Sequence, residues 1–215
     1  MHPESQMSFM IRPAQNEQEM DKVYRLVHDV YLRRGYCTPQ PDRRLRHYHH
    51  FDEIPETTVL IAIEDGKIIG TNSLTVDGPN GLPVDADFKH IVDTGRQEKH
   101  RLGAAWRMAT IPYYRNDKKL VIALIQETVS LVIRKNIRTM LFALNPRHQK
   151  VYERRLGMRT FSQKTNNVKC LKNAPAVLMR WDIERCPDRW LHTEEEKAAK
   201  LAAVKSAVYM PAINF

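Results

Sequence analysis

Residues 57–76, TTVLIAIEDGKIIGTNSLTV, constrain the fold of this chain more than any other segment. Two runs rich in β-branched residues flank Asp65-Gly66. An Asp-Gly pair favours a two-residue turn of type I′, because both central residues of that turn need a positive φ. The segment therefore predicts an antiparallel hairpin, and the other elements must be arranged around the sheet that contains it.

Strand and helix patterns alternate on both sides of the hairpin. Apolar residues recur at steps of three and four from Met20 to Tyr31, which predicts a helix ending near Gly35, and again from Val121 to Val132, which predicts a helix over 117–135. Shorter patterns predict strands over 9–12, 104–111, 138–144 and 177–182, a helix over 148–156, and loops over 37–56 and 77–88.

This order predicts a single α/β domain over 9–182, with a mixed central sheet flanked by helices. Thr193 and Glu196 have the spacing of a capping box ahead of a run of Ala, Lys and Leu. We therefore expect residues 187–215 to form a helical C-terminal extension.

The charge of the chain suggests an acidic partner. Its 34 Lys and Arg against 25 Asp and Glu give a net charge of +9. No RNA-binding signature or zinc-finger spacing accompanies this charge, so we expect no nucleic-acid partner. No run of about 18 apolar residues predicts an integral membrane segment, and the first residues do not resemble a secretion signal, so a cytoplasmic location is expected.

The cysteines and histidines predict neither disulfides nor a metal site. Cys37, Cys170 and Cys186 are far apart and lack CxxC spacing, which fits a reducing compartment. Cys37 has no recognisable His partner and is expected to be inert. The HYHH run at 47–50 has no accompanying Cys or carboxylate pattern, so its histidines are expected on the surface or in packing.

Residues 145–158, NPRHQKVYERRLGM, carry the first resemblance to a known family. Asn145 follows a predicted strand, and Tyr152 stands seven positions later, before Gly157. This resembles the last motif of the GCN5-related N-acyltransferases, whose order of strands and helices the chain also follows. The resemblance implies that Tyr152 protonates the leaving thiolate. Short motifs also match by chance, and the alternative is a core aromatic on a short helix.

A narrower resemblance extends over about residues 9–182. The chain is similar to long-chain N-acyl amino acid synthases of the FeeM type, themselves similar to acyl-homoserine lactone synthases. The matching segments, in order, are VYRLVHDVYLRRGY, the pair Phe51-Asp52, GTNSLTVDGPNGLPVDADF, AAWRMATIPYYRN and NPRHQKVYERRLGM.

The segment IPYYRNDKKL indicates which acyl donor to expect. Acyltransferases that bind acyl-CoA usually have a glycine-rich loop at this place, where backbone N–H groups hold the pyrophosphate. This segment contains no glycine. We therefore expect no bound cofactor and, as co-substrate, the 4′-phosphopantetheine thioester of acyl carrier protein. The residues expected to bind its phosphopantetheine arm are Tyr114, Arg115, Asn116 and Lys118.

An acidic carrier protein would also explain the basic charge. Arg43, Arg44, Arg46, Arg154 and Arg155 are candidates for steering it to the enzyme. The alternative is that these arginines form an ordinary solvated surface.

The resemblance implies transfer of a fatty acyl group from the carrier to the amine of an amino acid. Asp52 and Arg107 are then expected to bind the ammonium and carboxylate of the acceptor, and backbone N–H groups near Arg107 to Ala109 to hold the oxyanion. The residues expected to bind substrate are Asp52, Trp106, Arg107, Met108, Ala109 and Asn145.

The chain departs from its relatives at the position of the general base. Many relatives have a Glu three positions before the strand Arg, where this chain has Ala104. Three groups can replace that Glu as the general base: Glu98, Asp52 or a water held by the main chain. Glu98 is predicted to be catalytic together with Tyr152. Asn72-Ser73 stands where relatives often have an Arg, so synthesis of a homoserine lactone is disfavoured.

Two other functions stay open. One is a small-molecule N-acetyltransferase that uses acetyl-CoA, which would have to hold a pyrophosphate without glycines. The other is a catalytically silent module that binds carrier protein or lipid, suggested by Ala104.

Overall fold

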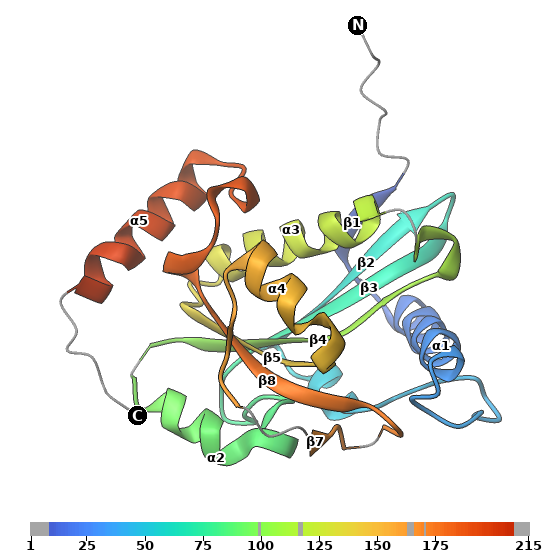
Figure 1. Ribbon diagram of the computed structural model, residues 1–215. Coiled ribbons are helices and arrows are strands. Elements are labelled where there is room, and N and C mark those ends of the chain that lie inside the picture. Colours follow the sequence, from blue (N-terminus) through green and yellow to red (C-terminus); the bar gives the residue numbers. More distant parts are fainter. Residues whose placement is uncertain (1–8, 99, 116–117, 163–165, 170, 209–215) are drawn as a thin grey trace, which may run out of the picture.

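The computed structural model describes residues 9–98, 100–115, 118–162, 166–169 and 171–208. Its centre is one twisted sheet with strand order β1-β2-β3-β4-β5-β8-β6, and β7 pairs with β8 (Figure 1). The sheet is mixed, because β4 and β5 run parallel and the other pairs run antiparallel.

The predicted hairpin forms the first half of the sheet. β2 (Thr57–Glu64) and β3 (Lys67–Val76) are joined at Asp65 and Gly66, whose φ angles are 48° and 71°. Those positive values fit the type I′ turn that the dipeptide predicts. β1 (Met10–Pro13) pairs with β2, and β4 (Leu102–Thr110) pairs with β3.

The second half of the sheet is built on β5 (Thr139–Leu144), which lies beside β4. β8 (Pro175–Asp182) pairs with β5 along its length, and the two-residue strands β6 (Arg159–Thr160) and β7 (Asn166–Asn167) pair with β8.

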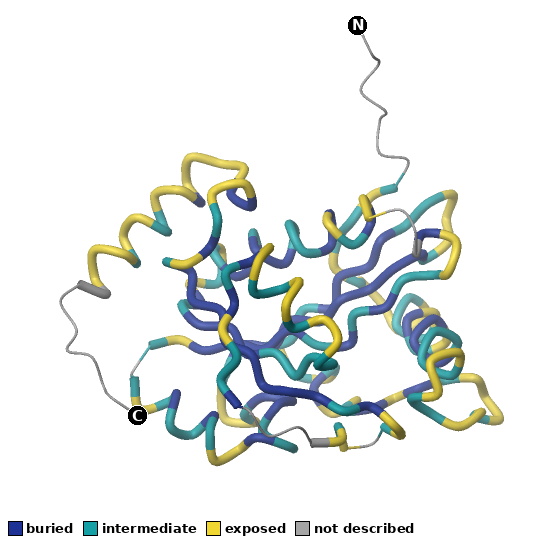
Figure 2. Tube along the Cα trace, viewed as in Figure 1, coloured by how far each residue is buried: buried dark blue, intermediate teal, exposed yellow. Residues whose placement is uncertain are grey.

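Helices cover both faces of the sheet. α1 (Glu17–Arg33) and α2 (Asp85–Arg96) lie on one face, and α3 (Lys118–Arg134), α4 (Gln149–Leu156) and α5 (Glu194–Val208) lie on the other (Figure 1). Alternate side chains of β2 point to opposite faces of the sheet, and both sets are apolar, so each face needs a covering helix. Val59 and Ile61 pack with α1, and the intervening Leu60 and Ala62 pack with α3. The buried residues accordingly follow the sheet through the middle of the molecule (Figure 2).

Short 3-10 helices connect these elements. They are η1 (His49–Glu53), η2 (Pro112–Arg115), η3 (Pro146–His148), η4 (Ile183–Arg185) and η5 (Asp188–Trp190). The fold class is as predicted, and most of the predicted elements differ from the observed ones by one to three residues at their ends.

Helix α2 was not predicted. Its first residues belong to a segment that the turn residues Gly81 and Pro83 marked as a loop. The Asp85 carboxylate accepts the N–H of Leu82 at 2.7 Å, which fixes the turn before the helix, and Phe88 and Val92 stabilise the helix by burying their side chains against the sheet.

The predicted C-terminal helix is present as α5, and it starts with the capping box. Thr193 Oγ1 accepts the N–H of Glu196 at 3.1 Å, and Glu196 Oε2 accepts the N–H of Thr193 at 3.1 Å. Glu196 also accepts a hydrogen bond from Ser130 of α3 at 2.5 Å, which ties α5 to the domain. In the described part of the chain, no helix has the length and apolar character to cross a membrane.

Candidate active site

The candidate site lies where β4 and β5 separate. The two strands pair only from Leu102 to Ala104 and from Thr139 to Leu141. Beyond those residues their facing edges are unpaired, and a cavity of about 450 Å³ occupies the gap. Residues of α1 line it from one face of the sheet, and residues of α3 and α4 line it from the other.

A bulge in β4 shapes the wall of this cavity. Thr71 pairs with Ala109 and Ser73 pairs with Trp106, so two residues of β4 stand opposite the single residue Asn72. Arg107 provides the extra residue and has a φ of 58°, in the left-handed region. A residue with a Cβ pays about 1–2 kcal/mol for this conformation, so neighbouring contacts must stabilise it.

The bulge places two consecutive side chains on the same face of the sheet. Trp106 contacts Phe51 of η1, and Arg107 contacts Asp52 of the same turn. The guanidinium of Arg107 also lies 4.4 Å from the centre of the Trp106 ring. In a regular strand these two side chains would point to opposite faces.

Arg107 is held by a buried ion pair. Its Nη1 and Nη2 donate to the two carboxylate oxygens of Asp52 at 2.7 and 2.6 Å, and its Nε and Nη2 donate to Ser73 Oγ at 3.1 and 2.8 Å. The exposed fractions of the Arg107 and Asp52 side chains are 0% and 3%. Tyr24 of α1 donates to Asp52 at 3.0 Å, and burial, then Asp52, raises the pKa of Tyr24 to about 12.

This geometry does not support the predicted roles of Asp52 and Arg107. The structure brings the two residues together as partners of each other, with four hydrogen bonds on the guanidinium. Arg107 lines the cavity, but four of the five N–H donors of its guanidinium bind Asp52 and Ser73, and Asp52 is not part of the lining, so the geometry favours a structural ion pair.

The other predicted residues of β4 do line the cavity. Trp106 is fixed by a hydrogen bond from its Nε1 to Thr75 Oγ1 at 3.0 Å, and Met108 and Ala109 follow the bulge. The N–H of Ile111 donates to the Ile69 carbonyl on β3. Because N–H groups alternate along a strand, those of Met108 and Thr110 point toward the gap.

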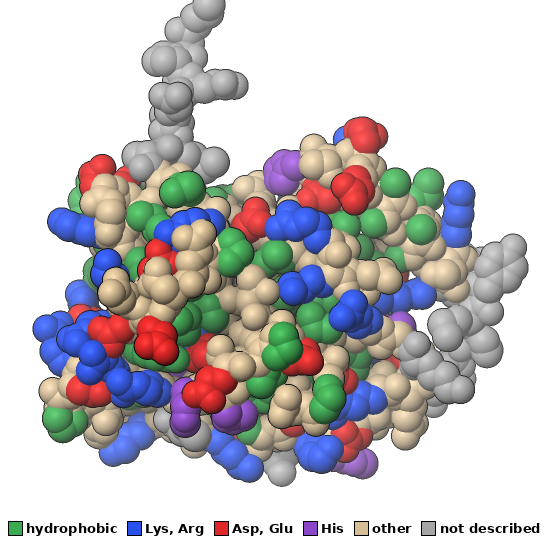
Figure 3. Space-filling model, turned by 180° about the vertical axis from the view of Figure 1, so that it is seen from behind, with side chains coloured by type: hydrophobic (Ala, Val, Ile, Leu, Met, Phe, Trp, Pro, Cys, Tyr) green, Lys and Arg blue, Asp and Glu red, His purple; other side chains and the backbone are tan. Residues whose placement is uncertain are grey.

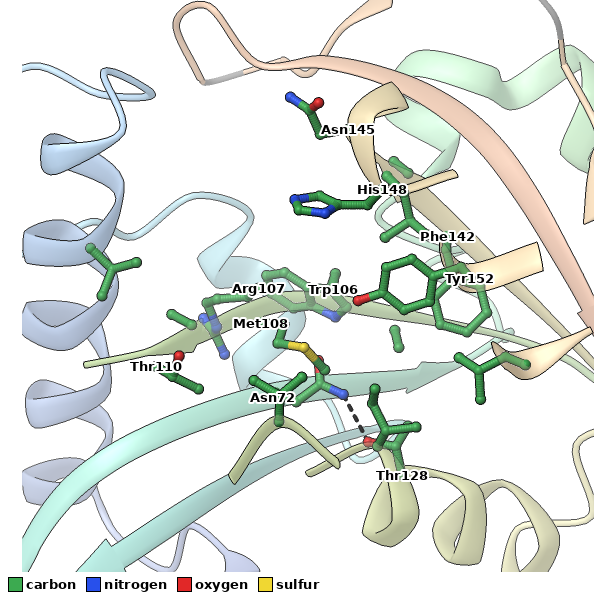
Figure 4. A pocket seen from close by; sticks show the side chains of 18 of the residues that line it. Asn72, Trp106, Arg107, Met108, Thr110, Thr128, Phe142, Asn145, His148 and Tyr152 are labelled. Carbon is green, nitrogen blue, oxygen red and sulfur yellow. Dashed lines mark hydrogen bonds between the residues drawn. The ribbon is translucent and has the colours of Figure 1, made fainter. Parts of the chain in front are cut away.

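Helix α4 provides the wall opposite β4. The hydroxyl of Tyr152 points into the cavity (Figure 4), and the structure shows no hydrogen-bond partner for it among the described residues. Burial raises the pKa of Tyr152, so the phenol keeps its proton at neutral pH. The helix ends at Gly157 with a φ of 70°, and a Cβ there would lie 2.6 Å from the Arg185 carbonyl oxygen.

Asn145 lines the cavity and also supports the turn before α4. Its Oδ1 accepts the N–H of Arg147 at 3.2 Å, which caps η3, and its Nδ2 donates to the Tyr36 hydroxyl at 3.3 Å. Asn145 therefore links the loop after β5 to the loop after α1.

The two ends of the cavity differ in polarity. The interior is lined mainly by apolar residues, namely Val121, Ile125, Val129, Val132, Met140, Leu156, Met158 and Trp181. The mouth is basic and is lined by Arg33, Arg34, Tyr36, Arg147 and His148. Among the described residues that line the cavity, none is Asp or Glu.

Glu98 lies away from this cavity. It follows α2, and its carboxylate accepts two hydrogen bonds from Arg180 of β8, one of them at 2.7 Å. Arg180 also binds Asp182, so Glu98 belongs to a charged cluster on the α2 face of the sheet. The geometry does not support Glu98 as the general base, and Asp52, which is bonded to Arg107, is likewise absent from the described lining of the cavity.

The predicted phosphopantetheine residues are not gathered around the cavity. Tyr114 is 8% exposed and donates its hydroxyl to Glu64 of the hairpin. Lys118 is exposed at the start of α3. The backbone of Arg115 belongs to η2, its side chain is not described, and Asn116 lies outside the described residues.

The sequence analysis missed four residues of the site: Tyr36, Asn72, Arg147 and His148. Asn72 stands opposite the bulge, and its Nδ2 donates to Thr128 Oγ1 at 2.8 Å (Figure 4). His148 stands four residues before Tyr152, a spacing that places two side chains on one face of a helix. That spacing was the signal available in the sequence.

The histidine run and Cys37 fit packing roles. His47 is 6% exposed between Tyr31 and Trp106, and burial, then Arg107, lowers its pKa to about 3. Burial raises the pKa of Cys37. Within the described part of the chain, no three His, Cys, Asp or Glu side chains form a group that could hold a metal ion.

Solved structures share this fold. A structure of FeeM, an N-acyl amino acid synthase from uncultured soil microbes, has a TM-score of 0.71 at 20% identity, and the match covers 92% of this chain and 97% of FeeM. The AHL synthase LasI has a TM-score of 0.60 at 14% identity, with coverage of 81% and 89%. The CoA-dependent acyl-homoserine lactone synthase BjaI has a TM-score of 0.57 at 14% identity, with coverage of 96% and 91%.

At these identities the structural matches establish the fold alone, which is that of the GCN5-related N-acyltransferases. A search of curated proteins gave no match. The family model described as N-acyl amino acid synthase FeeM matches residues 22–182, well over half of the chain, including the bulge and α4. The chain therefore belongs to the N-acyl amino acid synthase FeeM family and is an N-acyltransferase.

Proposed function

We propose that the protein transfers a long-chain acyl group from the phosphopantetheine thioester of acyl carrier protein to the amine of an amino acid. The observation that carries this proposal is the cavity between β4 and β5, with its apolar interior and its arginine-lined mouth. An acyl chain fits the interior, and an anionic acceptor fits the mouth.

The size of the apolar interior favours a long acyl chain over an acetyl group. The whole cavity, mouth included, has a volume of about 450 Å³, within the range of small-molecule sites, and its apolar lining provides more contact than an acetyl group can use. Burying an acyl chain contributes about 0.8 kcal/mol for each CH₂ group removed from water. The lining from Val121 to Val132 on α3 provides that apolar contact.

The two walls of the cavity supply complementary groups for thioester aminolysis. The backbone N–H of Met108 points into the gap and is a donor for the oxyanion that forms when the amine attacks the carbonyl carbon. When the C–S bond breaks, the sulfur takes the bonding electron pair, and Tyr152 donates its proton to the thiolate. The raised pKa of Tyr152 keeps that proton available.

The surface charges favour α4 as the docking surface for an acidic carrier protein. Arg43, Arg44 and Arg46 are each paired with an Asp near α1, and Figure 3 shows basic and acidic side chains interleaved at that edge of the molecule. Among the described residues, no acid pairs with Lys150, Arg154 or Arg155. These cations are exposed on α4, the helix that begins directly after Arg147 and His148 of the mouth, and suit an acidic protein.

Matched donors and a mixture of amino acids test this proposal. Purified protein would be given dodecanoyl carrier protein or dodecanoyl-CoA, and the products would be identified by mass spectrometry. We expect N-dodecanoyl amino acids, with a higher kcat/KM for the carrier thioester. Equal kcat/KM values for the two donors would contradict dependence on the carrier protein. Products that contain no amino acid would contradict the proposed acceptor.

A further inference from the structure

One edge of the Arg147 guanidinium is occupied by two neutral acceptors. Its Nε donates to His148 Nε2 at 3.0 Å, and its Nη2 donates to the Tyr36 hydroxyl at 2.9 Å. In a bidentate pair, two parallel N–H groups of a guanidinium bind the two oxygens of a carboxylate. Among the described residues, no carboxylate pairs with Arg147.

His148 is the sole imidazole among the described residues that line the cavity, and no carboxylate lines it. It precedes α4 by one residue, so its ring and the Tyr152 phenol lie one turn apart and both point into the cavity (Figure 4). A neutral imidazole has one acceptor nitrogen, and here that nitrogen, Nε2, is occupied by Arg147.

We propose that the carboxylate of an amino-acid acceptor replaces His148 and Tyr36 on Arg147, and that the released His148 accepts the proton of the attacking amine. The inference deepens the proposed function and rests on its amino-acid acceptor. In an α-amino acid the amine and the carboxylate share one carbon atom. A carboxylate on Arg147 therefore brings the amine beside the imidazole that it has just released.

The proposed step balances protons and electrons. The ammonium of the acceptor first loses one proton to solvent. The amine nitrogen then forms a C–N bond to the thioester carbon, and the carbonyl oxygen receives the π electron pair. His148 Nε2 takes a proton from the positively charged nitrogen. The C=O bond forms again, the C–S bond breaks, and Tyr152 protonates the sulfur. His148 and Tyr152 then exchange protons with solvent, leaving an amide and a thiol.

The surroundings of His148 keep it neutral and ready to act as a base. The charged and titratable groups that line the cavity with it are Arg147 on its own turn, Tyr31, Arg33, Arg34 and Tyr36 from α1 and the loop after it, Arg107 from β4, and Tyr152 from α4. Burial, followed by Arg147 and Arg34, lowers the pKa of His148 below its usual value of about 6.5. The limb of the pH profile that belongs to His148 should therefore lie below about pH 6.5, and the rate should rise again at higher pH as the ammonium of the acceptor loses its proton.

The arrangement also explains how the protein would select amino acids. An amine without a carboxylate leaves Arg147 bonded to His148, so the base stays blocked. Phenylalanine and phenethylamine differ only in that carboxylate, and together they form a matched pair of acceptors for the test.

The first arm of the test measures kcat against pH with phenylalanine and dodecanoyl carrier protein. In His148→Gln, kcat should fall by about 10²- to 10⁴-fold, the usual contribution of a general base, and the acidic limb of the profile should disappear. His148→Ala should regain activity when imidazole is added, which a purely structural role would not produce. His90→Gln, at an exposed position of α2, is the control.

The second arm compares the two acceptors in Arg147→Met. KM for phenylalanine should rise, and kcat/KM for phenethylamine should rise above the wild-type value, because the variant lacks the guanidinium that occupies His148 Nε2. A His148→Gln enzyme with an unchanged profile, or an Arg147→Met enzyme that still prefers phenylalanine, overturns this inference alone. A wild-type enzyme that acylates no amino acid overturns the proposed acceptor and this inference with it.

Discussion

Asp52 and Arg107, 55 residues apart in the sequence, form a two-bond ion pair behind the bulge in β4. The pair joins η1 to the strand that lines the cavity, and Ser73 completes it from β3. Because Arg107 is the residue with the left-handed backbone, these bonds hold the conformation that directs the Met108 N–H into the gap. We infer that the ion pair positions the oxyanion site.

Removing one charge of this pair should destabilise the fold. In Asp52→Asn the buried guanidinium of Arg107 loses its ionic partner, and breaking a buried pair in this way typically costs about 3–5 kcal/mol. Urea unfolding followed by circular dichroism would measure the change. The control is Asp42→Asn, whose pair with Arg46 is exposed and screened by solvent, so its unfolding midpoint should hardly change. Equal midpoints for both variants would contradict a structural role for Asp52.

Features set by neighbouring residues were predictable from the sequence. The hairpin follows from Asp65-Gly66, the packing of α3 follows from its apolar stripe, and the end of α4 follows from Gly157. Each signal lies within one element, so it needs no knowledge of the rest of the fold. The presence of Tyr152 in the cavity was implied by the family motif and agrees with the structure.

Features set by distant partners were not predictable. Arg107 has no side-chain preference for a left-handed backbone, so nothing local marks the bulge, and its partner Asp52 comes from another layer. Glu98 was one of the replacements for the Glu that is missing at Ala104. The fold places it beside Arg180 instead, on the face opposite α3. Such partnerships depend on topology, which one sequence does not display.

The length of the acyl chain should depend on the apolar residues of α3. Ile125 is half-buried and lines the cavity, so Ile125→Phe should fill part of the interior and shift the preferred donor toward shorter chains. A series of carrier thioesters with acyl chains of increasing length would measure kcat/KM for each. The control is Ile122→Phe on the same helix, because Ile122 is 37% exposed and lies outside the lining. An identical chain-length profile in both variants would rule out this binding region.

Reversing charge on α4 should weaken the use of the carrier protein. The double variant Lys150→Glu, Arg154→Glu should raise KM for dodecanoyl carrier protein and leave KM for dodecanoyl-CoA nearly unchanged, because the two donors share the thioester but not the protein surface. In the wild type, association should also slow as salt is added, since the Debye length falls from about 30 Å at 0.01 M to about 8 Å at 0.15 M.

The control for this charge reversal is Lys205→Glu, an exposed cation on α5 away from the mouth. An equal rise of KM in the control would indicate that net charge alone attracts the carrier. If the rate of association does not respond to salt, the cations of α4 do not steer the carrier protein and form an ordinary solvated surface.

Tyr152→Phe should separate the chemical role of Tyr152 from its packing. The variant keeps the ring between α4 and the cavity but removes the proton, and the hydroxyl has no partner to lose among the described residues, so stability should hardly change. Acyl transfer should slow by on the order of 10²-fold if general-acid help has its usual size. A thiol with a pKa of about 8.5 is already a fair leaving group, so a smaller loss of about tenfold also fits the role. Single-turnover rates with saturating carrier thioester isolate the chemical step. An unchanged rate would show that Tyr152 is a core aromatic of α4 and that the leaving thiolate takes its proton from elsewhere.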